Sequence, residues 1–220
     1  MASVTNTEVS TWTKSELVRY VGSLSNPSKM PCYGYSLPAQ ECITGSKLRP
    51  VEGTVCNECY ALKNRFLFPK VQSAMYRRLA SIVQPLWAKA MAELINRTGN
   101  GFFRWHDSGD LQSTDHLRQI VKICNLTPDV QHWLPTREIR MVERYVARGG
   151  EIPDNLTIRL SAHLVDGKAP EIRGITASTV SRDERPVGAH VCPAPKQDNH
   201  CGSCRACWSR DVPIVDYRLH

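Results

Sequence analysis

The chain has 220 residues, of which 41% are hydrophobic and 22% are charged, proportions typical of a globular protein with one sizeable core. No run of about 18 apolar residues occurs, so we expect no membrane-spanning segment, and the N-terminus lacks the pattern of a signal peptide. These features predict a cytoplasmic protein with reduced thiols. The net charge of +7 permits weak attraction to nucleic acid, but the charges appear scattered, so a solvated surface is the preferred interpretation.

The N-terminal part is expected to contain helices separated by a long loop. Residues 13–24 predict a short helix, with Thr13 as its N-cap and Glu16 completing a capping box. Residues 27–60 are rich in Pro, Gly and Ser and predict a loop that carries four cysteines. Residues 70–97 have helical apolar spacing, which Pro85 is expected to break or kink.

The central part alternates strand and helix patterns. Strands are predicted in "GFFRW", "DVQHWLPT" and "NLTIRLSAH", with shorter candidates in "GITASTV" and "VGAHVC", and helices in "STDHLRQIVKICN" and "REIRMVERYVARGG". Short connections between alternating elements predict right-handed crossovers and a mainly parallel sheet. The expected fold is therefore α/β, a partial (β/α) barrel in one domain. Its parts are residues 1–69 (helix and Cys-rich loop), 70–191 (α/β core) and 192–220 (Cys-rich segment).

Polar residues are concentrated where the predicted strands end. In parallel α/β folds, reactive groups collect at the carboxyl ends of the strands. His106 or Asp107 could transfer protons there, and the arginines could hold an anionic substrate. The alternative is that such residues only cap helices or close turns. The candidate catalytic residues are Arg104, His106, Asp107, Asp110, Arg137, Arg159 and His163.

Four cysteines near the C-terminus follow the pattern Cys-Pro-x7-Cys-x2-Cys-x2-Cys. Three cysteines at this spacing with a separate Cys-Pro match the content of bacterial ferredoxin loops, although there the Cys-Pro follows the triple. Four thiolates would complete a [4Fe-4S] cluster, and the alternative is a structural zinc site. We favour the cluster. The predicted ligands are Cys192, Cys201, Cys204 and Cys207.

A second group of cysteines lies in the N-terminal loop, where Cys42, Cys56 and Cys59 are predicted to bind a metal. If only these three bind a [4Fe-4S] cluster, one iron stays open for a substrate or cofactor. If Cys32 also binds, the site is closed. A single cluster shared between the early and late cysteines is a further alternative, and two sites are preferred.

The remaining candidate ligands are weaker. Cys124 stands alone among apolar residues at helical spacing and is interpreted as a core residue. His190 and His200 flank late cysteines and could replace one thiolate, although histidines in such places are usually solvent-exposed bystanders. No sequence signal identifies the oligomeric state.

Several motifs in order carry a family resemblance: "YSLPAQEC", "VCNECYA", "FRWHDSGDLQS", "HWLPTRE", "IPDNLTIRLSA" and "CPAP…CGSCRACW". Together they resemble the bacteriophage gene product 88 family over roughly residues 30–210. The "CNECYA" element also resembles phage radical-SAM-like proteins. The resemblance implies a cluster loop at Cys42, Cys56 and Cys59 with a partial barrel behind it, in a protein of the infected cell's cytoplasm.

The cluster loop differs from the radical S-adenosylmethionine (SAM) pattern of Cys-x3-Cys-x2-Cys with an aromatic residue before the last cysteine. Here the first gap is thirteen residues, and Glu58 precedes Cys59. SAM is therefore one candidate cofactor, and direct binding of a substrate to an open iron is another.

Three functions are compatible with these features. The first is an iron–sulfur enzyme acting on a small-molecule or nucleic-acid substrate, with a reductant protein as a further partner. The second is a zinc-stabilised basic protein that binds nucleic acid or a host factor. The third is an iron–sulfur electron carrier or redox sensor. We favour the enzyme, because neither a scaffold nor an electron carrier needs His, Asp and Arg gathered at one edge of a sheet.

Overall fold

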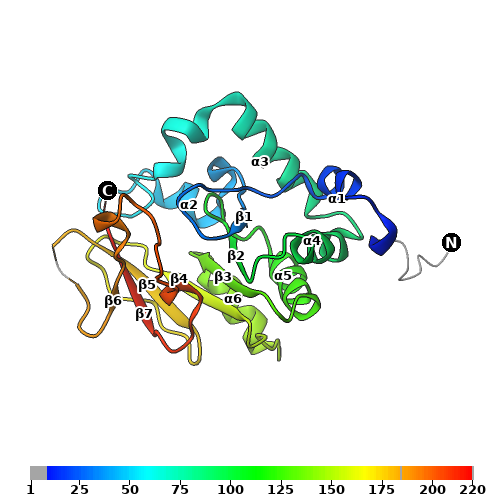
Figure 1. Cartoon of the computed structure of the whole chain (residues 1–220). Coiled ribbons are helices and arrows are strands. Elements are labelled where there is room, and N and C mark those ends of the chain that lie inside the picture. The colour runs from blue at the N-terminus through cyan, green and yellow to red at the C-terminus, as the bar shows by residue number, and fades with distance from the viewer. Residues whose placement is uncertain (1–8, 184, 220) are drawn as a thin grey trace.

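The computed structural model describes residues 9–183 and 185–219, and it contains one seven-stranded sheet (Figure 1). All strand pairs are parallel, which confirms the predicted parallel α/β sheet. The strand order is β1-β2-β3-β4-β5-β7-β6, and the sheet is open, with β1 and β6 at its edges. The strands are β1 (Tyr33–Tyr35), β2 (Phe102–Trp105), β3 (Gln131–Thr136), β4 (Leu156–Ser161), β5 (Thr176–Ser181), β6 (His190–Val191) and β7 (Ile214–Arg218).

The helices largely follow the predicted pattern. Thr13 caps α1 in the predicted capping box with Glu16, although α1 ends at a left-handed Gly22, earlier than expected. The predicted break near Pro85 is confirmed, because it separates α3 from α4. The helices are α1 (Lys14–Val21), α2 (Ile43–Leu48), α3 (Pro69–Ser81), α4 (Trp87–Asn96), α5 (Thr114–Leu126) and α6 (Ile139–Ala147). None of the helices described combines the length and apolarity that a bilayer crossing requires.

The loop predicted for residues 27–60 contains more structure than expected. It holds the first strand, β1, and the six-residue helix α2. A three-residue strand with glycine at its centre is too short to give an alternating pattern, and a helix of fewer than two turns gives no apolar stripe. The residues 1–8, in which no signal peptide was predicted, lie outside the described chain.

The two faces of the sheet are covered by different parts of the chain. On one face, strand side chains such as Phe103, Trp105 and Leu134 form the main core with α1, α4, α5 and α6. Cys124 on α5 is fully buried in this core, as predicted. On the other face, Trp133 packs with Trp208 and Cys32, so the late cysteine segment covers this side. Helices therefore cover one face, and a cysteine-rich coil covers the other.

The C-terminal strand β7 lies second from one edge of the sheet, between β5 and β6. β7 pairs with β5 on one side and with β6 on the other. In the sheet, β6 pairs only with β7. The tail that follows the cysteine segment is therefore a structural part of the sheet.

Candidate metal and substrate site

The early thiols Cys42, Cys56 and Cys59 gather at the carboxyl ends of the strands. Cys42 immediately precedes α2, and a Cβ atom at Gly45 would lie 3.7 Å from its Sγ and 3.6 Å from the Sγ of Cys56. The segment before Cys56 is fixed to the end of β4, because the Val55 amide donates to the His163 carbonyl at 2.9 Å. Glycine at position 45 therefore lets two sulfurs from separate segments approach one helical turn.

The three early thiols interact electrostatically. Burial raises the pKa of Cys42, and the charges of Asp110, Cys59 and Cys56 raise it further, while Arg137 lowers it. Burial also raises the pKa of Cys56, with Arg137 opposing and Cys59 adding to the rise. Without a bound cation the raised pKa values of Cys42 and Cys56 favour the protonated thiols, and a metal would have to displace their protons.

Two acidic residues at the ends of strands fix the turn after β3, and one of them joins that turn to the helix that follows Cys42. The Glu138 carboxylate accepts hydrogen bonds from the Thr44 amide at 2.7 Å and from the Thr44 hydroxyl at 2.8 Å, in the first turn of α2. Asp110 accepts from the Thr136 hydroxyl at 2.6 Å and from the Arg137 amide at 2.9 Å. Burial raises the pKa of Asp110 to about 6 despite these bonds. Both carboxylates thus position the turn after β3, and Glu138 was missed in the sequence because it reads as an ordinary helix start.

Two of the predicted arginines retain unused donors: Arg137 lies near the early thiols, and Arg104 lies near Cys32 and the late thiols. The Arg137 Nε is buried and has no hydrogen-bond partner among the described residues, and the same is true of the Arg104 Nε. The Arg104 guanidinium lies 4.4 Å from the centre of the Trp133 ring, and its Nη1 meets only the Met30 sulfur at 3.1 Å. A guanidinium group with unused N–H donors can bind an anionic ligand.

Asp107 and His163 connect the site to its surroundings. Asp107 accepts a hydrogen bond from the Ser36 hydroxyl, and its carbonyl accepts one from the Tyr60 hydroxyl. The His163 Nε2 lies 3.2 Å from the Arg137 carbonyl. His163 therefore links the loop before Cys56 to the turn that carries Arg137. Tyr60 was missed as a site residue, although it directly follows the last early cysteine.

His106 lies in the core behind the site. Its ring packs against His116, with ring centres 5.4 Å apart, and neither ring nitrogen has a hydrogen-bond partner in the described part of the chain. Burial lowers the pKa of His106 well below its ordinary value. The neutral ring faces the helices, so the structure does not bring His106 to the early thiols as the strand-end argument expected.

The Arg159 side chain is likewise unavailable to a ligand. It is fully buried, and its guanidinium makes five hydrogen bonds to backbone carbonyls. The acceptors are the carbonyls of Ala177, Ala206, Cys207, Ser209 and Val212. A guanidinium has five N–H donors, so none is left for a substrate. Arg159 instead fastens the late cysteine segment to β4.

The late thiols gather on the coil-covered face, and Cys32 joins them. Cys32 packs against Trp133 and Trp208, and Cys207 contacts the same cluster. Burial raises the pKa of Cys32 to about 12, and Cys201 contributes to the rise. The Cys201 amide also donates to the Lys29 carbonyl at 3.2 Å. Cys32 is thus a neighbour of the late group, whereas its sequence position favoured the early one.

The other late cysteines lie near polar partners. The Cys207 Sγ lies 3.1 Å from the Tyr217 hydroxyl, and the Cys204 Sγ lies 3.4 Å from the His190 Nε2. His190 is therefore near a late thiol, whereas the His200 ring makes no such contact within the described residues. Within residues 9–183 and 185–219, no group of three or more His, Cys, Asp or Glu side chains is arranged to hold a metal ion. The predicted metal-binding roles of the early and the late cysteines are accordingly not shown.

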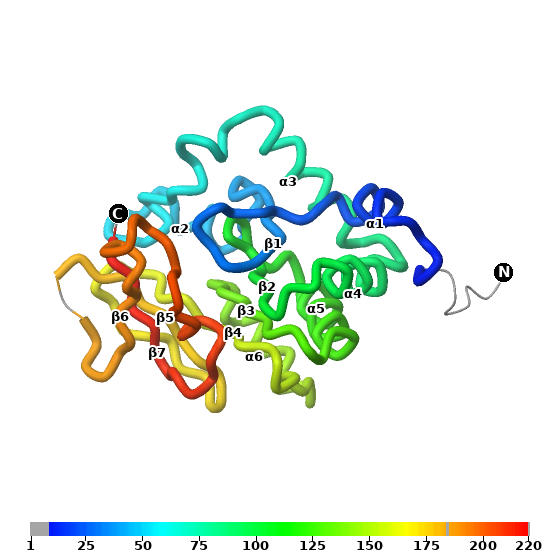
Figure 2. The backbone as a smooth tube through the Cα atoms, in the orientation of Figure 1, coloured from blue at the N-terminus to red at the C-terminus, as the bar shows by residue number. Residues whose placement is uncertain are grey.

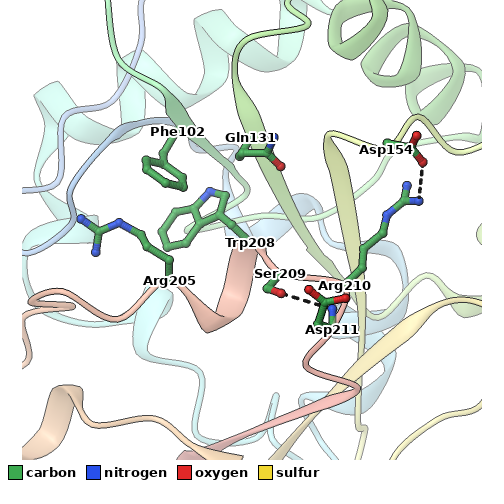
Figure 3. Close-up of a pocket in the computed structure, with 8 residues that line it drawn as sticks. All are labelled: Phe102, Gln131, Asp154, Arg205, Trp208, Ser209, Arg210 and Asp211. Atoms are coloured by element: carbon green, nitrogen blue, oxygen red, sulfur yellow. Dashed lines mark hydrogen bonds and ion pairs between the residues drawn. The ribbon is translucent and has the colours of Figure 1, made fainter.

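A hollow of about 360 Å³ lies at the opposite ends of the strands (Figure 3). Two of its charged side chains pair, Arg210 with Asp154 at 3.3 Å, and the Arg205 guanidinium donates to the Gly202 and Cys204 carbonyls. No predicted site residue lines it. The lining residues are Phe102, Gln131, Asp154, Arg205, Trp208, Ser209, Arg210 and Asp211.

Comparison with known proteins identifies one family. A family model described as "Gene product 88" matches residues 5–214, a longer range than the motifs quoted above span. No curated protein and no solved structure gives a significant match. The radical-SAM part of the resemblance finds no support in these comparisons.

Proposed function

This chain belongs to the gene product 88 family, and for it we propose the function of an iron–sulfur enzyme. Cys42, Cys56 and Cys59 would hold a [4Fe-4S] cluster that leaves one iron open to an anionic substrate or to SAM. One observation carries the proposal: thiols from two segments meet at the carboxyl ends of parallel strands, beside the unpaired Nε donor of Arg137.

The topology supports this placement. Strands β1 to β5 are adjacent in chain order, and helices pack on one face of them. This order supports the partial (β/α) barrel that we propose, a fold in which ligands bind at the carboxyl ends of the strands. The early thiols lie at that end, because the Cys42 and Cys56 segments are fixed to the residues that follow β3 and β4.

The donor set fits the proposed group. Three cysteines supply soft thiolate ligands of the kind that iron–sulfur clusters require. A single zinc ion needs its sulfurs about 2.3 Å from one point, whereas a four-iron cluster is larger and does not demand that convergence. When bound, the cluster would supply a Lewis-acidic iron and a one-electron couple.

The chain's own residues would bind and position the substrate. Arg137 lies near two of the early thiols, and its free Nε would hold an anionic group there. Arg104 would hold a second anionic group, because stacking on Trp133 fixes its guanidinium. Asp110 and Glu138 would act as positioning residues through the turn after β3.

The late cysteines would form a second, closed centre with a structural role. This segment is joined to the sheet by Arg159 and by Trp208, whose Nε1 donates to the Phe103 carbonyl at 2.9 Å. A fully ligated cluster in this place would stabilise the coil that covers one face of the sheet.

The test is the iron and acid-labile sulfide content of protein purified without oxygen. We expect about eight irons per chain with equal sulfide, as for two four-iron clusters. Cys56→Ser should remove about half of both while leaving the late centre filled. Cys124→Ala is the matched control, because this thiol lies in the core, and it should leave both contents unchanged.

A colourless protein with zinc and no sulfide would overturn the iron–sulfur function and favour a zinc-stabilised binding protein. If both clusters are present, binding of SAM should be measured on the same sample. Cys56→Ser would abolish that binding if SAM occupies the open iron. Retention of both clusters in Cys56→Ser would contradict the assignment of the early centre.

A further inference from the structure

The excess positive charge of the chain is concentrated in one stretch. Residues 59–92 contain no Asp or Glu and six Lys or Arg residues, while the whole chain has 28 basic and 21 acidic residues. This stretch therefore supplies six of the seven excess positive charges. The scattered distribution expected above is thus wrong, because basic and acidic residues balance almost completely elsewhere.

The first part of this stretch forms a raised arch at one side of the molecule (Figure 2). It runs through the short turns Tyr60–Leu62 and Asn64–Leu67 into α3. We refer to residues 60–77 as the basic arch. Its basic side chains are all exposed, and the ion pairs of the described residues lie elsewhere. These side chains are Lys63, Arg65, Lys70 and Arg77.

Large apolar side chains are exposed between these charges. Tyr60, Leu67, Phe68 and Tyr76 are each between 43% and 57% exposed, and the Tyr60 ring lies edge-on to Phe66 at 5.7 Å. Side chains exposed to this extent keep much of their apolar surface in water, so they add little to the stability of the fold. Exposed aromatic rings among unpaired cations therefore indicate a surface built for a ligand.

We propose that the basic arch binds single-stranded nucleic acid. The cations would contact phosphates, and the aromatic rings would stack on unpaired bases, a combination typical of single-strand binding surfaces. A duplex would not use these rings, because its bases are already stacked. Two acidic groups lie beside the arch and are engaged: Glu41 accepts from the Tyr76 hydroxyl at 3.2 Å, and Glu58 pairs with Arg182 at 3.5 Å.

The arch begins at the candidate site. Tyr60 directly follows Cys59, and its hydroxyl donates to the Asp107 carbonyl. A strand lying along the arch would therefore end near the early thiols and Arg137. Binding by the arch does not depend on which metal those thiols hold, so it can be tested separately from the proposed enzyme function.

The experiment uses fluorescence anisotropy to measure the binding of a labelled oligo-dT of about 20 nucleotides to the intact protein at several salt concentrations. We expect the logarithm of the association constant to fall linearly with the logarithm of the salt concentration. Lys63→Glu with Lys70→Glu should weaken binding at least tenfold and lower the salt slope by about 1.4 or more, given about 0.7 per phosphate contact on single strands.

Aromatic contacts are tested by Phe68→Ala, which should weaken binding about fivefold or more. The matched controls are Arg140→Glu with Arg144→Glu on the exposed side of α6, and Leu126→Ala on α5, which change charge and exposed apolar area elsewhere. Circular dichroism and the iron content of each variant separate lost binding from lost structure.

Equal weakening by the α6 charge variant would overturn the proposal, because binding would then follow net charge. Unchanged affinity in Phe68→Ala would overturn the single-strand assignment and leave only polyanion attraction. Binding to vesicles of anionic lipid, with no binding to oligo-dT, would assign the arch to a membrane surface instead.

Discussion

The two cysteine groups are held by the fold in different ways. The late group lies on a coil that is fixed by the five hydrogen bonds of Arg159 and by the buried Trp208. The early group lies on loops joined to the sheet by a few contacts, among them the Glu138–Thr44 pair. Arg137 beside it keeps a free donor, and the exposed arch begins next to it. Arg159 is thus fully used in holding the late segment, whereas Arg137 beside the early thiols keeps a donor that a reactive centre could use.

The largest expected effect is on the late group. Arg159→Met would leave five buried carbonyls without their donor, and each loss costs about 1–3 kcal/mol if not relieved by water. We expect the free energy of unfolding to fall by more than about 4 kcal/mol. The measurement is urea denaturation, supported by proteolysis of the segment around residue 205.

Arg137→Met is the matched control for the early group. The Arg137 side chain makes no hydrogen bond to the described residues, so its loss should change the free energy of unfolding by less than about 1 kcal/mol. Similar stabilities for the two variants would contradict the difference between the groups.

A second, smaller effect belongs to the helix-covered face, which neither cysteine group touches. Burial lowers the pKa of His132 to about 3, below the ordinary value of about 6.5. The unfolded chain therefore binds a proton first as the pH falls. The contribution of neutral His132 to the free energy of unfolding is fully present above about pH 6.5. It is lost progressively down to about pH 3, at about 1.4 kcal/mol per pH unit.

His132→Gln tests this effect. At pH 5 the histidine of the wild-type chain should cost about 2 kcal/mol relative to pH 7, and the variant should lack that part of the pH dependence. Urea midpoints of both proteins at pH 5 and pH 7 measure the difference. Parallel pH profiles would show that His132 protonates in the folded chain, and the assignment to burial would then be wrong.

The smallest effect concerns the loop of the early group. Glu138→Gln places an amide donor against one of the two Thr44 donors. We therefore expect the free energy of unfolding to fall by about 1–2 kcal/mol. Iron should decrease at the early centre and remain at the late one. Tyr217→Phe, which removes the hydroxyl beside Cys207, is the counterpart for the late centre. Equal iron loss in both variants would mean that the two groups assemble as one unit.

Periodicity and capping predicted most of the fold. The capping box at Thr13, the break near Pro85 and the strand–helix alternation after residue 100 were all readable, because each depends on neighbouring residues. The short strand β1 was missed, because it exists only through pairing with β2. Local signals predict such elements poorly, since distant partners stabilise them.

The candidate site was predictable in its residue types but not in its roles. Arg104 and Arg159 both interrupt apolar strands, yet one stacks on Trp133 with unused donors and the other is completely bonded. Only tertiary contacts separate these cases. Likewise, Cys32 reads as part of the early group, whereas packing against Trp208, far along the chain, brings it to the late one.

The position of β7 has a consequence for biosynthesis. Because β6 pairs in the sheet only with β7, it cannot join the growing sheet until residues 214–218 have left the ribosome. The cysteines between these strands must wait in an open loop until then, while β1 to β5 can already pair. That loop would therefore close only after β7 has paired, later than the segments that carry the early thiols.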